Sequence, residues 1–363
     1  MRTWTLAIVV LLLSAVASGQ DPVRIEPPEE VSAAAFDAAA KDAEAAYRET
    51  AVGVLRVFVS RLVDVERAAV GDGRIEAANH VRRVADRHTA LADEVSKHIW
   101  LGGLVPAPKK PDESLGIGDA ITECQGELAA AEKAYREALT KAKGEAGMAL
   151  RPALALAIRC ADLDAANRVK AVEKEIDRDI RDRTRPLSLR EYRFETMEDV
   201  ERRFLVTSPS DWRVVDGELI GSAMSGGRIT AAPGFRFISS VTLRARIVPP
   251  SRQNLRLSVG PMNAIFNWEL ATQSHFRWYT DLTVVPRHVL VPGREQEIVV
   301  RQLTKKSFEI RVDGERVWIR HGRLLGTMSL YPALDSTIGV REIRILGIPE
   351  DRARPDGPSH RQR

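Results

Sequence analysis

The N-terminal half of the chain repeats itself at a fixed interval, which limits the folds that it can adopt. The sequence "AEAAYRE" at 43–49 corresponds to "AEKAYRE" at 131–137, and "EAANHVRRV" at 76–84 corresponds to "DAANRVKAV" at 164–172. Both pairs are separated by 88 residues. A constant offset over two separate matches is hard to obtain by chance, so we predict that one structural unit occurs twice.

Each unit is predicted to be a long helical hairpin. In the first unit, at about 33–98, apolar residues recur in alternating steps of three and four, as they do along the buried seam of a helix. The second unit occupies about 119–182, and Pro152 is expected to kink its outgoing helix. A single hairpin leaves its apolar seam exposed. We therefore expect the two hairpins to pack as a four-helix bundle within a helical domain at 20–185.

The hydrophobic period changes in the second half of the chain. Runs such as "VTLRARIV" at 241–248 and "EIVVRQL" at 297–303 alternate apolar with polar residues, which indicates strands with one buried face. Asp-Gly pairs at 216–217 and 313–314 are strong hairpin signals, and no helix is expected between 190 and 349. We predict a β-sandwich of two antiparallel sheets, a jelly roll, at 190–349. The whole chain is therefore expected to be an α+β multidomain protein.

Three segments of this second half resemble a known family. They are "DWRVVDGELIG", "VPGREQEIVVRQLTKKSFEIRVDGERV" and "LLGTMSLYPALDSTIGVREIRILGIP". They resemble the concanavalin A-like, laminin-G-like sandwich, in the variety described as 3-keto-disaccharide hydrolase-like in secreted bacterial proteins. The resemblance covers about 190–349 and rests on the order of strands and hairpin turns. It implies a jelly-roll fold and a sugar-related role outside the cell, and the family includes lectin-like and glycan-cleaving members.

The N-terminus predicts export. Arg2 precedes the apolar run "LAIVVLLL" at 6–13, and small residues follow, so a signal peptide is predicted at 1–19, with cleavage after Ala17 or Gly19. The mature protein is then expected to be periplasmic or extracellular, with no transmembrane segment. The tail at 350–363 is polar and rich in arginine and proline, which is typical of disorder.

Composition argues against several functions. The formal charge is only +4 and the basic residues are spread along the chain, so we expect no nucleic-acid partner. The two cysteines, Cys124 and Cys160, are too few for a thiolate metal site. On one continuous helix they would lie about 54 Å apart, so they are not expected to form a disulfide with each other. No metal site and no cofactor are predicted.

The aromatic-rich segment "IFNWELATQSHFRWY" at 265–279 contains the candidate site. Strand alternation assigns Phe266, Trp268, Phe276 and Trp278 to the core. The outer or concave face then receives a mixed set that suits a sugar, because aromatic faces contact C–H surfaces while amide, carboxylate and guanidinium groups bind hydroxyls. The predicted carbohydrate ligands are Asn267, Glu269, His275, Arg277 and Tyr279.

Three functions remain open from the sequence. The leading hypothesis is an exported, non-catalytic, lectin-like module that binds a carbohydrate or a cell-envelope glycan. It would be carried on a helical domain that binds a protein partner or self-associates. The second is a structural or protein-interaction role in the envelope without sugar binding. The third is a glycoside hydrolase of the 3-keto-disaccharide type. The Glu-x-Asp-x-x-Glu pattern of catalytic members of the wider superfamily is not found in 190–349, and no catalytic residue is predicted.

Overall fold

The computed structural model describes residues 27–98, 101–109, 116–222, 227–231, 234–251, 254–268, 273–287, 289–332 and 336–350. The predicted signal peptide lies outside these residues, as does the predicted disordered tail from 351 onward. In the described part a helical region precedes two antiparallel sheets, which confirms the predicted fold class. None of the helices in this part combines the length and the apolar composition needed to cross a bilayer.

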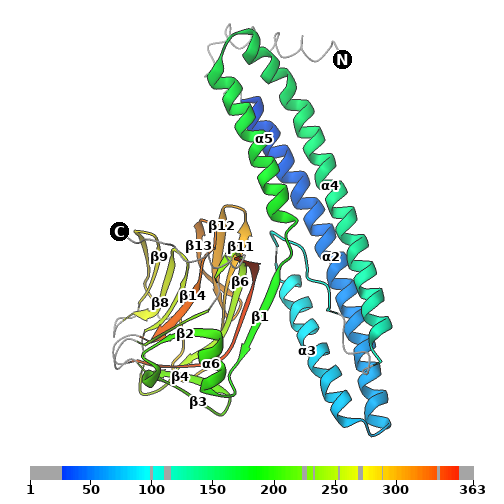
Figure 1. The fold of residues 1–363 in the computed structure, drawn as a ribbon. Helices are drawn as coiled ribbons and strands as arrows, with labels where there is room; N and C mark the ends of the chain where they lie inside the picture. The colour runs from blue at the N-terminus through cyan, green and yellow to red at the C-terminus, as the bar shows by residue number, and fades with distance from the viewer. Residues whose placement is uncertain are drawn as a thin grey trace, which may run out of the picture. The chain divides into compact units, whose positions relative to one another are not determined.

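The long helices occur as two consecutive pairs, and in each pair a longer helix is followed by a shorter one (Figure 1). They are α2 (Pro28–Gly71), α3 (Ile75–Ser96), α4 (Gly118–Arg159) and α5 (Leu163–Arg183). A glycine turn with Gly73 at φ +74° connects α2 to α3. The helix α4 continues through Pro152, and Cys124 and Cys160 are both free, which confirms that they do not pair.

The chain divides into two compact units. The smaller unit comprises residues up to Ala40 and Ala138–Asp179, and so takes the start of α2, the second half of α4 and most of α5. Its helices are joined by an ion pair between Arg168 and Glu29 and by another between Lys143 and Asp177. They enclose a small apolar core of Phe36, Leu139, Ala142, Leu150, Val169 and Ile176.

The larger unit comprises Lys41–Glu137 and Ile180–Arg363. Its helices bury the predicted seam, with Phe58 and Leu62 of α2 and Val81 of α3 at most 1% exposed. Tyr47 and Tyr135 occupy equivalent positions in the predicted repeat, and their rings stack with centroids 5.0 Å apart. Equivalent tyrosines of the two hairpins therefore meet on neighbouring helices.

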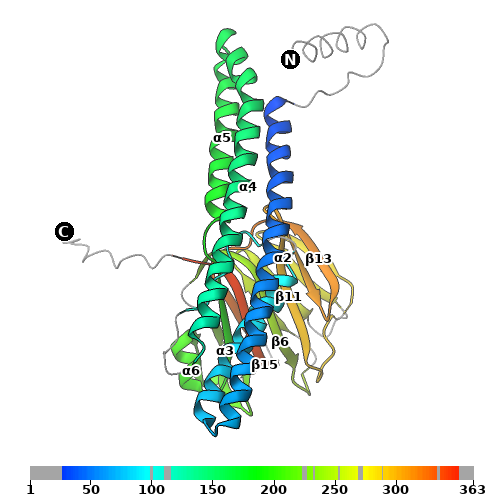
Figure 2. The same ribbon diagram turned by 90° about the vertical axis from the view of Figure 1, so that its right-hand side faces the viewer.

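The sandwich consists of an eight-stranded and a seven-stranded sheet. The larger sheet has the order β13-β12-β11-β6-β15-β4-β3, with β1 also paired to β15, and Figure 2 shows β11, β6 and β15 side by side. Its strands are β1 (Ser188–Arg193), β3 (Trp212–Val215), β4 (Glu218–Ser222), β6 (Phe235–Ile247), β11 (Gln296–Thr304), β12 (Ser307–Val312), β13 (Glu315–His321) and β15 (Thr337–Pro349).

The seven-stranded sheet has the order β10-β9-β8-β7-β14-β5-β2. Its strands are β2 (Phe204–Thr207), β5 (Arg228–Ala231), β7 (Leu255–Val259), β8 (Met262–Trp268), β9 (Gln273–Trp278), β10 (Asp281–Val285) and β14 (Met328–Pro332). A short helix, α6 (Met197–Arg203), and a 3-10 turn at Pro209–Asp211 interrupt the strands. The expectation of no helix here was wrong: the Thr196 hydroxyl accepts a hydrogen bond from the Asp199 amide and caps one short helix.

The core of the sandwich lies between the two sheets. Alternate residues of β11, such as Ile298 and Val300, are fully buried, because successive side chains of a strand point to opposite faces. Phe276 of the seven-stranded sheet stacks on Trp318 of the eight-stranded sheet, with ring centroids 5.6 Å apart. The Asp313-Gly314 turn has positive φ at both residues, as a tight hairpin requires, which confirms the predicted hairpin.

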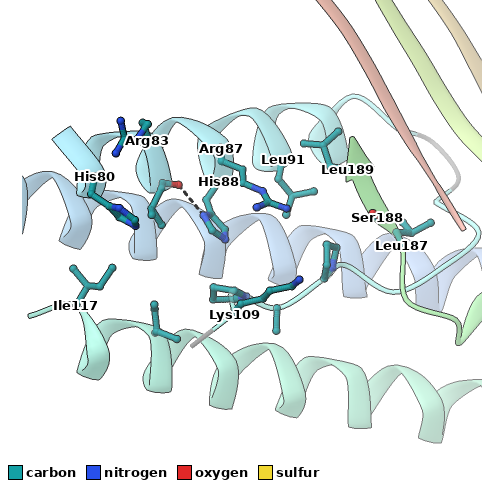
Figure 3. A pocket seen from close by; sticks show the side chains of 15 residues that line it. His80, Arg83, Arg87, His88, Leu91, Lys109, Ile117, Leu187, Ser188 and Leu189 are labelled. Carbon is teal, nitrogen blue, oxygen red and sulfur yellow. Dashed lines mark hydrogen bonds between the residues drawn. The ribbon is translucent and has the colours of Figure 1, made fainter. Parts of the chain in front are cut away.

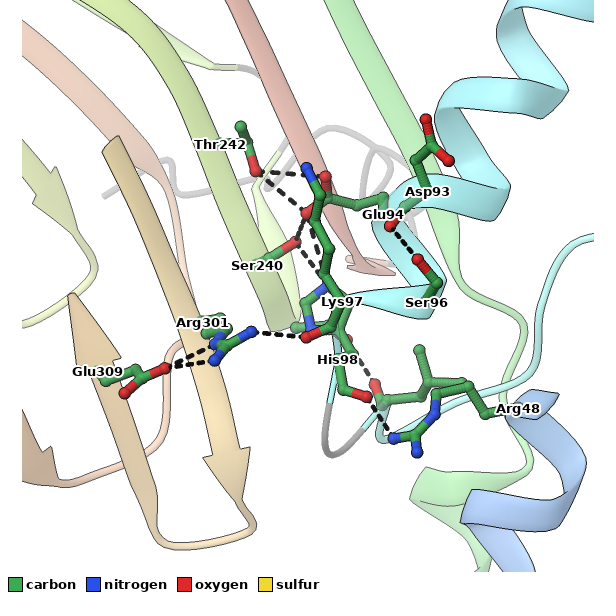
Figure 4. A network of polar contacts seen from close by, with 12 residues as sticks. Arg48, Asp93, Glu94, Ser96, Lys97, His98, Ser240, Thr242, Arg301 and Glu309 are labelled. Carbon is green, nitrogen blue, oxygen red and sulfur yellow. Dashed lines mark hydrogen bonds and ion pairs between the residues drawn. The ribbon is translucent and has the colours of Figure 1, made fainter. Parts of the chain in front are cut away.

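A buried polar cluster joins the end of α3 to the outer face of β6 (Figure 4). The Ser240 hydroxyl donates to Glu94 at 2.6 Å and the Thr242 hydroxyl donates to it at 3.1 Å. The Nε2 atom of His98 lies 3.0 Å from the Ser240 oxygen. Arg301 of β11 also donates to the Lys97 carbonyl at 2.6 Å. These bonds fix the end of α3 on the eight-stranded sheet.

The contribution of Glu94 to the stability of the protein should depend on pH. Burial alone raises the pKa of Glu94, but the hydrogen bond and charge of His98 and the Ser240 hydroxyl outweigh it and lower the pKa to about 2. This contribution to stability is complete above the ordinary pKa of 4.5 and is lost as the pH falls toward 2. Between pH 6 and pH 3 we expect the wild type to lose about 2 kcal/mol more than Glu94→Gln, as measured by urea unfolding. An equal loss in both proteins would contradict the prediction.

Candidate functional site

The aromatic-rich segment forms two neighbouring strands of the seven-stranded sheet, β8 and β9. Their pairing runs regularly from Met262 opposite Trp278 to Ile265 opposite His275. The register then shifts, and Trp268 pairs with Gln273. A bulge therefore interrupts β8, and the alternation of faces that holds before it no longer applies after it.

Asn267 lies at this bulge and is fully buried, so its predicted place on the outer face was wrong. Its Oδ1 accepts hydrogen bonds from the amides of Val289 and Leu290, both at 3.0 Å, and its Nδ2 donates to the Leu290 carbonyl at 2.7 Å. Its φ is +56°, a conformation that asparagine tolerates better than most residues. Asn267 thus connects the bulge to the segment at 289–290 through hydrogen bonds.

The bulge turns Trp268 out of the core, where alternation had placed it. The Trp268 ring is half-buried and stacks on the ring of His275, with centroids 5.0 Å apart and planes 17° apart. Phe266 and Phe276 are fully buried, as predicted. Trp278 contacts Phe308 at the edge of the core, 5.0 Å between ring centroids.

The other predicted ligands do not gather around one point. Arg277 is exposed and lies opposite Asn263 on β8. Tyr279 is 67% exposed and lies in the turn after β9, with its ring edge against Trp278. Glu269 lies outside the described residues. Of the five predicted ligands, His275 is the one that the structure brings into contact with an outward-facing aromatic ring.

Three residues that the sequence analysis missed, Arg256, Asn263 and Tyr331, complete this arrangement. Arg256 of β7 places its guanidinium carbon 5.3 Å from the Trp268 ring centroid and 5.6 Å from that of Tyr331 on β14. Asn263 of β8 donates to the Tyr331 hydroxyl at 3.4 Å. We call Arg256, Asn263, Trp268, His275 and Tyr331 the aromatic–arginine face.

The aromatic–arginine face carries positive charge and unused hydrogen-bonding groups. The Nε of Arg256 and the Oδ1 of Asn263 are buried without a hydrogen-bond partner among the described residues. Among the described residues of the seven strands, Asp281 is the only carboxylate, and it forms an ion pair with Arg320. A ligand at this face would therefore meet a cation, two flat aromatic surfaces and an amide.

Carboxylates are abundant on the outer face of the other sheet, but arginines bind them. Glu309 receives hydrogen bonds from Arg301 and Arg311, both at 2.7 Å. Burial raises the pKa of Glu309, but these arginines outweigh it and lower the pKa below its ordinary value. Glu342 pairs with Arg344 at 2.8 Å and behaves in the same way. These carboxylates thus stabilise the sheet through ion pairs.

No family model matches this chain, and no curated protein matches it either. Solved structures similar to its sandwich include porphyranase B from Zobellia galactanivorans, with 6% identity, 44% of this chain and 93% of that chain covered, and a TM-score of 0.31. Another is β-agarase B from the same organism, with 10% identity, coverage of 44% and 94%, and a TM-score of 0.32. The carbohydrate recognition domain of Emp47p has 10% identity, coverage of 40% and 89%, and a TM-score of 0.30. Similarities at this level show neither a shared ligand nor a shared activity.

Proposed function

We propose that the protein binds a carbohydrate on the aromatic–arginine face and does not cleave it. The observation that carries this proposal is the position of the Arg256 guanidinium within cation–π distance of both Trp268 and Tyr331. A pyranose ring presents C–H groups that pack on flat aromatic surfaces and hydroxyls that bind amide and guanidinium groups. Arg256 and Asn263 bring a guanidinium group and an amide group to this face, the two kinds of group that bind such hydroxyls.

The charge of the face favours an acidic sugar. Arg256 and the nearby Arg277 lie on the outer surface of this sheet. Asp281, the one carboxylate among the described residues of its strands, already forms an ion pair with Arg320. Arginine binds carboxylate and sulfate groups through paired hydrogen bonds. We therefore expect uronic-acid or sulfated oligosaccharides to bind more tightly than neutral oligosaccharides of equal length.

The composition of the sheet supports binding without hydrolysis. A retaining glycosidase needs two carboxyl groups about 5–5.5 Å apart on either side of the scissile bond. The described residues of the seven strands contain one carboxylate. In this proposal the protein is exported, and its helical part carries the sandwich and contacts a protein partner or a second copy.

Substitution on the aromatic–arginine face should weaken sugar binding without unfolding the protein. We expect Arg256→Gln to weaken binding of an acidic oligosaccharide by about tenfold or more, because a hydrogen bond to a charged group is worth about 1.5–3 kcal/mol. Trp268→Ala should weaken binding as well, since stacking adds about 0.5–1.5 kcal/mol beyond the buried area. Isothermal titration measures both effects, and circular dichroism reports the fold.

Tyr279→Ala is the matched control, because Tyr279 is an exposed aromatic residue of the same sheet that lies outside the face. It should bind as the wild type does. If the wild type binds no acidic or neutral oligosaccharide on a glycan array, the protein-interaction role becomes the better explanation. Unchanged binding in both Arg256→Gln and Trp268→Ala would place any sugar site elsewhere.

A further inference from the structure

The helical part of the larger unit contains a pocket that the proposed sugar site does not use (Figure 3). Its volume is about 560 Å³, within the range of about 300–1,000 Å³ that is typical of small-molecule sites. The walls come from α3, the segment at 106–109, the start of α4 and the start of β1. Segments from three parts of the sequence, at 80–91, 106–121 and 187–189, therefore line one pocket.

Part of the lining is apolar. The apolar residues that line the pocket are Leu91 of α3, Ile117 just before α4, Ile121 in the first turn of α4, Leu187 just before β1, and Leu189 of β1. Each of these residues is less than 9% exposed. Such a surface favours an apolar chain or ring system, at about 25 cal/mol per Å² of apolar surface buried.

Another part of the lining is basic. His80, Arg83 and Arg87 follow one another at helical spacing along α3, and Lys109 lies on the adjoining segment. No described residue of the lining is acidic, and neither Arg83 nor Arg87 forms an ion pair within the described ranges. Two like charges four residues apart on a helix are unfavourable, so this arrangement does not arise from helix stability. Arg82, by contrast, forms an ion pair with Glu66, and its Nε donates to the carboxylate at 2.7 Å.

His88 adds a polar side chain to the pocket wall. Its side chain is 9% exposed, and its ring packs edge-on against Phe58. Burial lowers the pKa of His88, and its Nδ1–H donates to the Val84 carbonyl at 2.8 Å. The ring is therefore neutral, and Nε2 is left as an acceptor without a hydrogen-bond partner among the described residues. Figure 3 shows this ring among the side chains that line the cavity.

We propose that this pocket binds a small anionic amphiphile. Its carboxylate, sulfate or phosphate head group contacts Arg83 and Arg87, and its apolar body covers Leu91, Ile117 and Ile121. The head group supplies the negative charge that the described lining lacks, and the apolar body fills a cavity whose deep wall cannot bind a polar molecule favourably. This proposal is independent of sugar binding, since the two sites share no residue.

The binding of a fluorescent anion, anilinonaphthalene sulfonate, to the mature full-length chain tests the proposal. We expect saturable binding at one site, weakened about tenfold or more in the Arg83→Gln/Arg87→Gln double variant, because two charge-assisted contacts are lost. Arg82→Gln is the matched control on the same helix and should bind as the wild type does. Ala107→Phe places a ring in the pocket from an exposed lining position and should abolish binding while the circular dichroism spectrum is unchanged.

Competition identifies the chemistry of the ligand. Dodecanoate should displace the probe, whereas acetate, which lacks the chain, and dodecyl maltoside, which lacks the charge, should not. The proposal is overturned if binding is not saturable, if both the double variant and Ala107→Phe bind the probe as the wild type does, or if the uncharged detergent competes as well as dodecanoate.

Discussion

Replacement of Glu44 by alanine is expected to lower the free energy of unfolding by about 3–5 kcal/mol. The Glu44 carboxylate is 1% exposed and forms an ion pair with Arg183, whose side chain is 4% exposed. The same carboxylate accepts hydrogen bonds from the amides of Leu101 and Gly102. Alanine would remove the Glu44 carboxylate from the buried charge of Arg183, and removing one member of a buried ion pair is strongly destabilising.

A companion variant separates the lost ion pair from other effects of the substitution. The double variant Glu44→Ala/Arg183→Met should be more stable than Glu44→Ala alone, because it removes the unpaired charge and keeps an apolar side chain of similar length. Glu49→Ala, at an exposed position of the same helix, should change stability by no more than about 0.5 kcal/mol. Urea unfolding of all four proteins measures these differences. A loss of unfolding free energy below about 1 kcal/mol in Glu44→Ala would contradict this account of the ion pair.

Local periodicity was sufficient to predict the long helices and the β-sandwich, although not the short helix α6. The seam that includes Phe58 and Leu62 is buried because a helix brings every third or fourth residue to one face. The strand β11 buries alternate residues, and the Asp313-Gly314 turn reverses the chain where the dipeptide predicts it. These features depend on residues within one or two turns of one another, so a single sequence contains the whole signal.

The buried acids could not be predicted in this way. The charged residues of the helices are interpreted most simply as solvated, yet Glu44 and Glu94 are each 1% exposed. Glu94 is covered because α3 packs on Ser240 and Thr242, which lie more than 140 residues further along the chain. Nothing in the local pattern of α3 distinguishes this carboxylate from an exposed one, since its environment depends on tertiary packing.

The candidate site shows the same limit. Alternation predicted the burial of Phe266 and Phe276 correctly, because both lie where β8 and β9 pair regularly. It failed for Trp268, which follows the bulge. Arg256 and Tyr331 were missed because their proximity depends on β7 lying between β8 and β14, and strand order is not encoded in a local pattern. An asparagine within a strand-like run was the one local sign of a bulge.

Asn267 provides the sharpest contrast between a ligand role and a structural role. We expect Asn267→Ala to lower the free energy of unfolding by about 3 kcal/mol or more. The amides of Val289 and Leu290 and the Leu290 carbonyl lose their partner, and each unsatisfied buried group costs about 1–3 kcal/mol. Alanine also tolerates the φ of +56° poorly.

Two further substitutions divide this loss into its parts. Asn267→Gly removes the same hydrogen bonds but adopts positive φ freely, so it should be about 1 kcal/mol more stable than Asn267→Ala. Asn267→Asp keeps both acceptor contacts and loses the donor to Leu290. Asn263→Ala, on the partly exposed face of the same strand, should unfold within about 1 kcal/mol of the wild type. If Asn267→Ala instead keeps its stability and loses only sugar binding, Asn267 is a ligand after all. The bulge would then not depend on its side chain, and the outward position of Trp268 would need another cause.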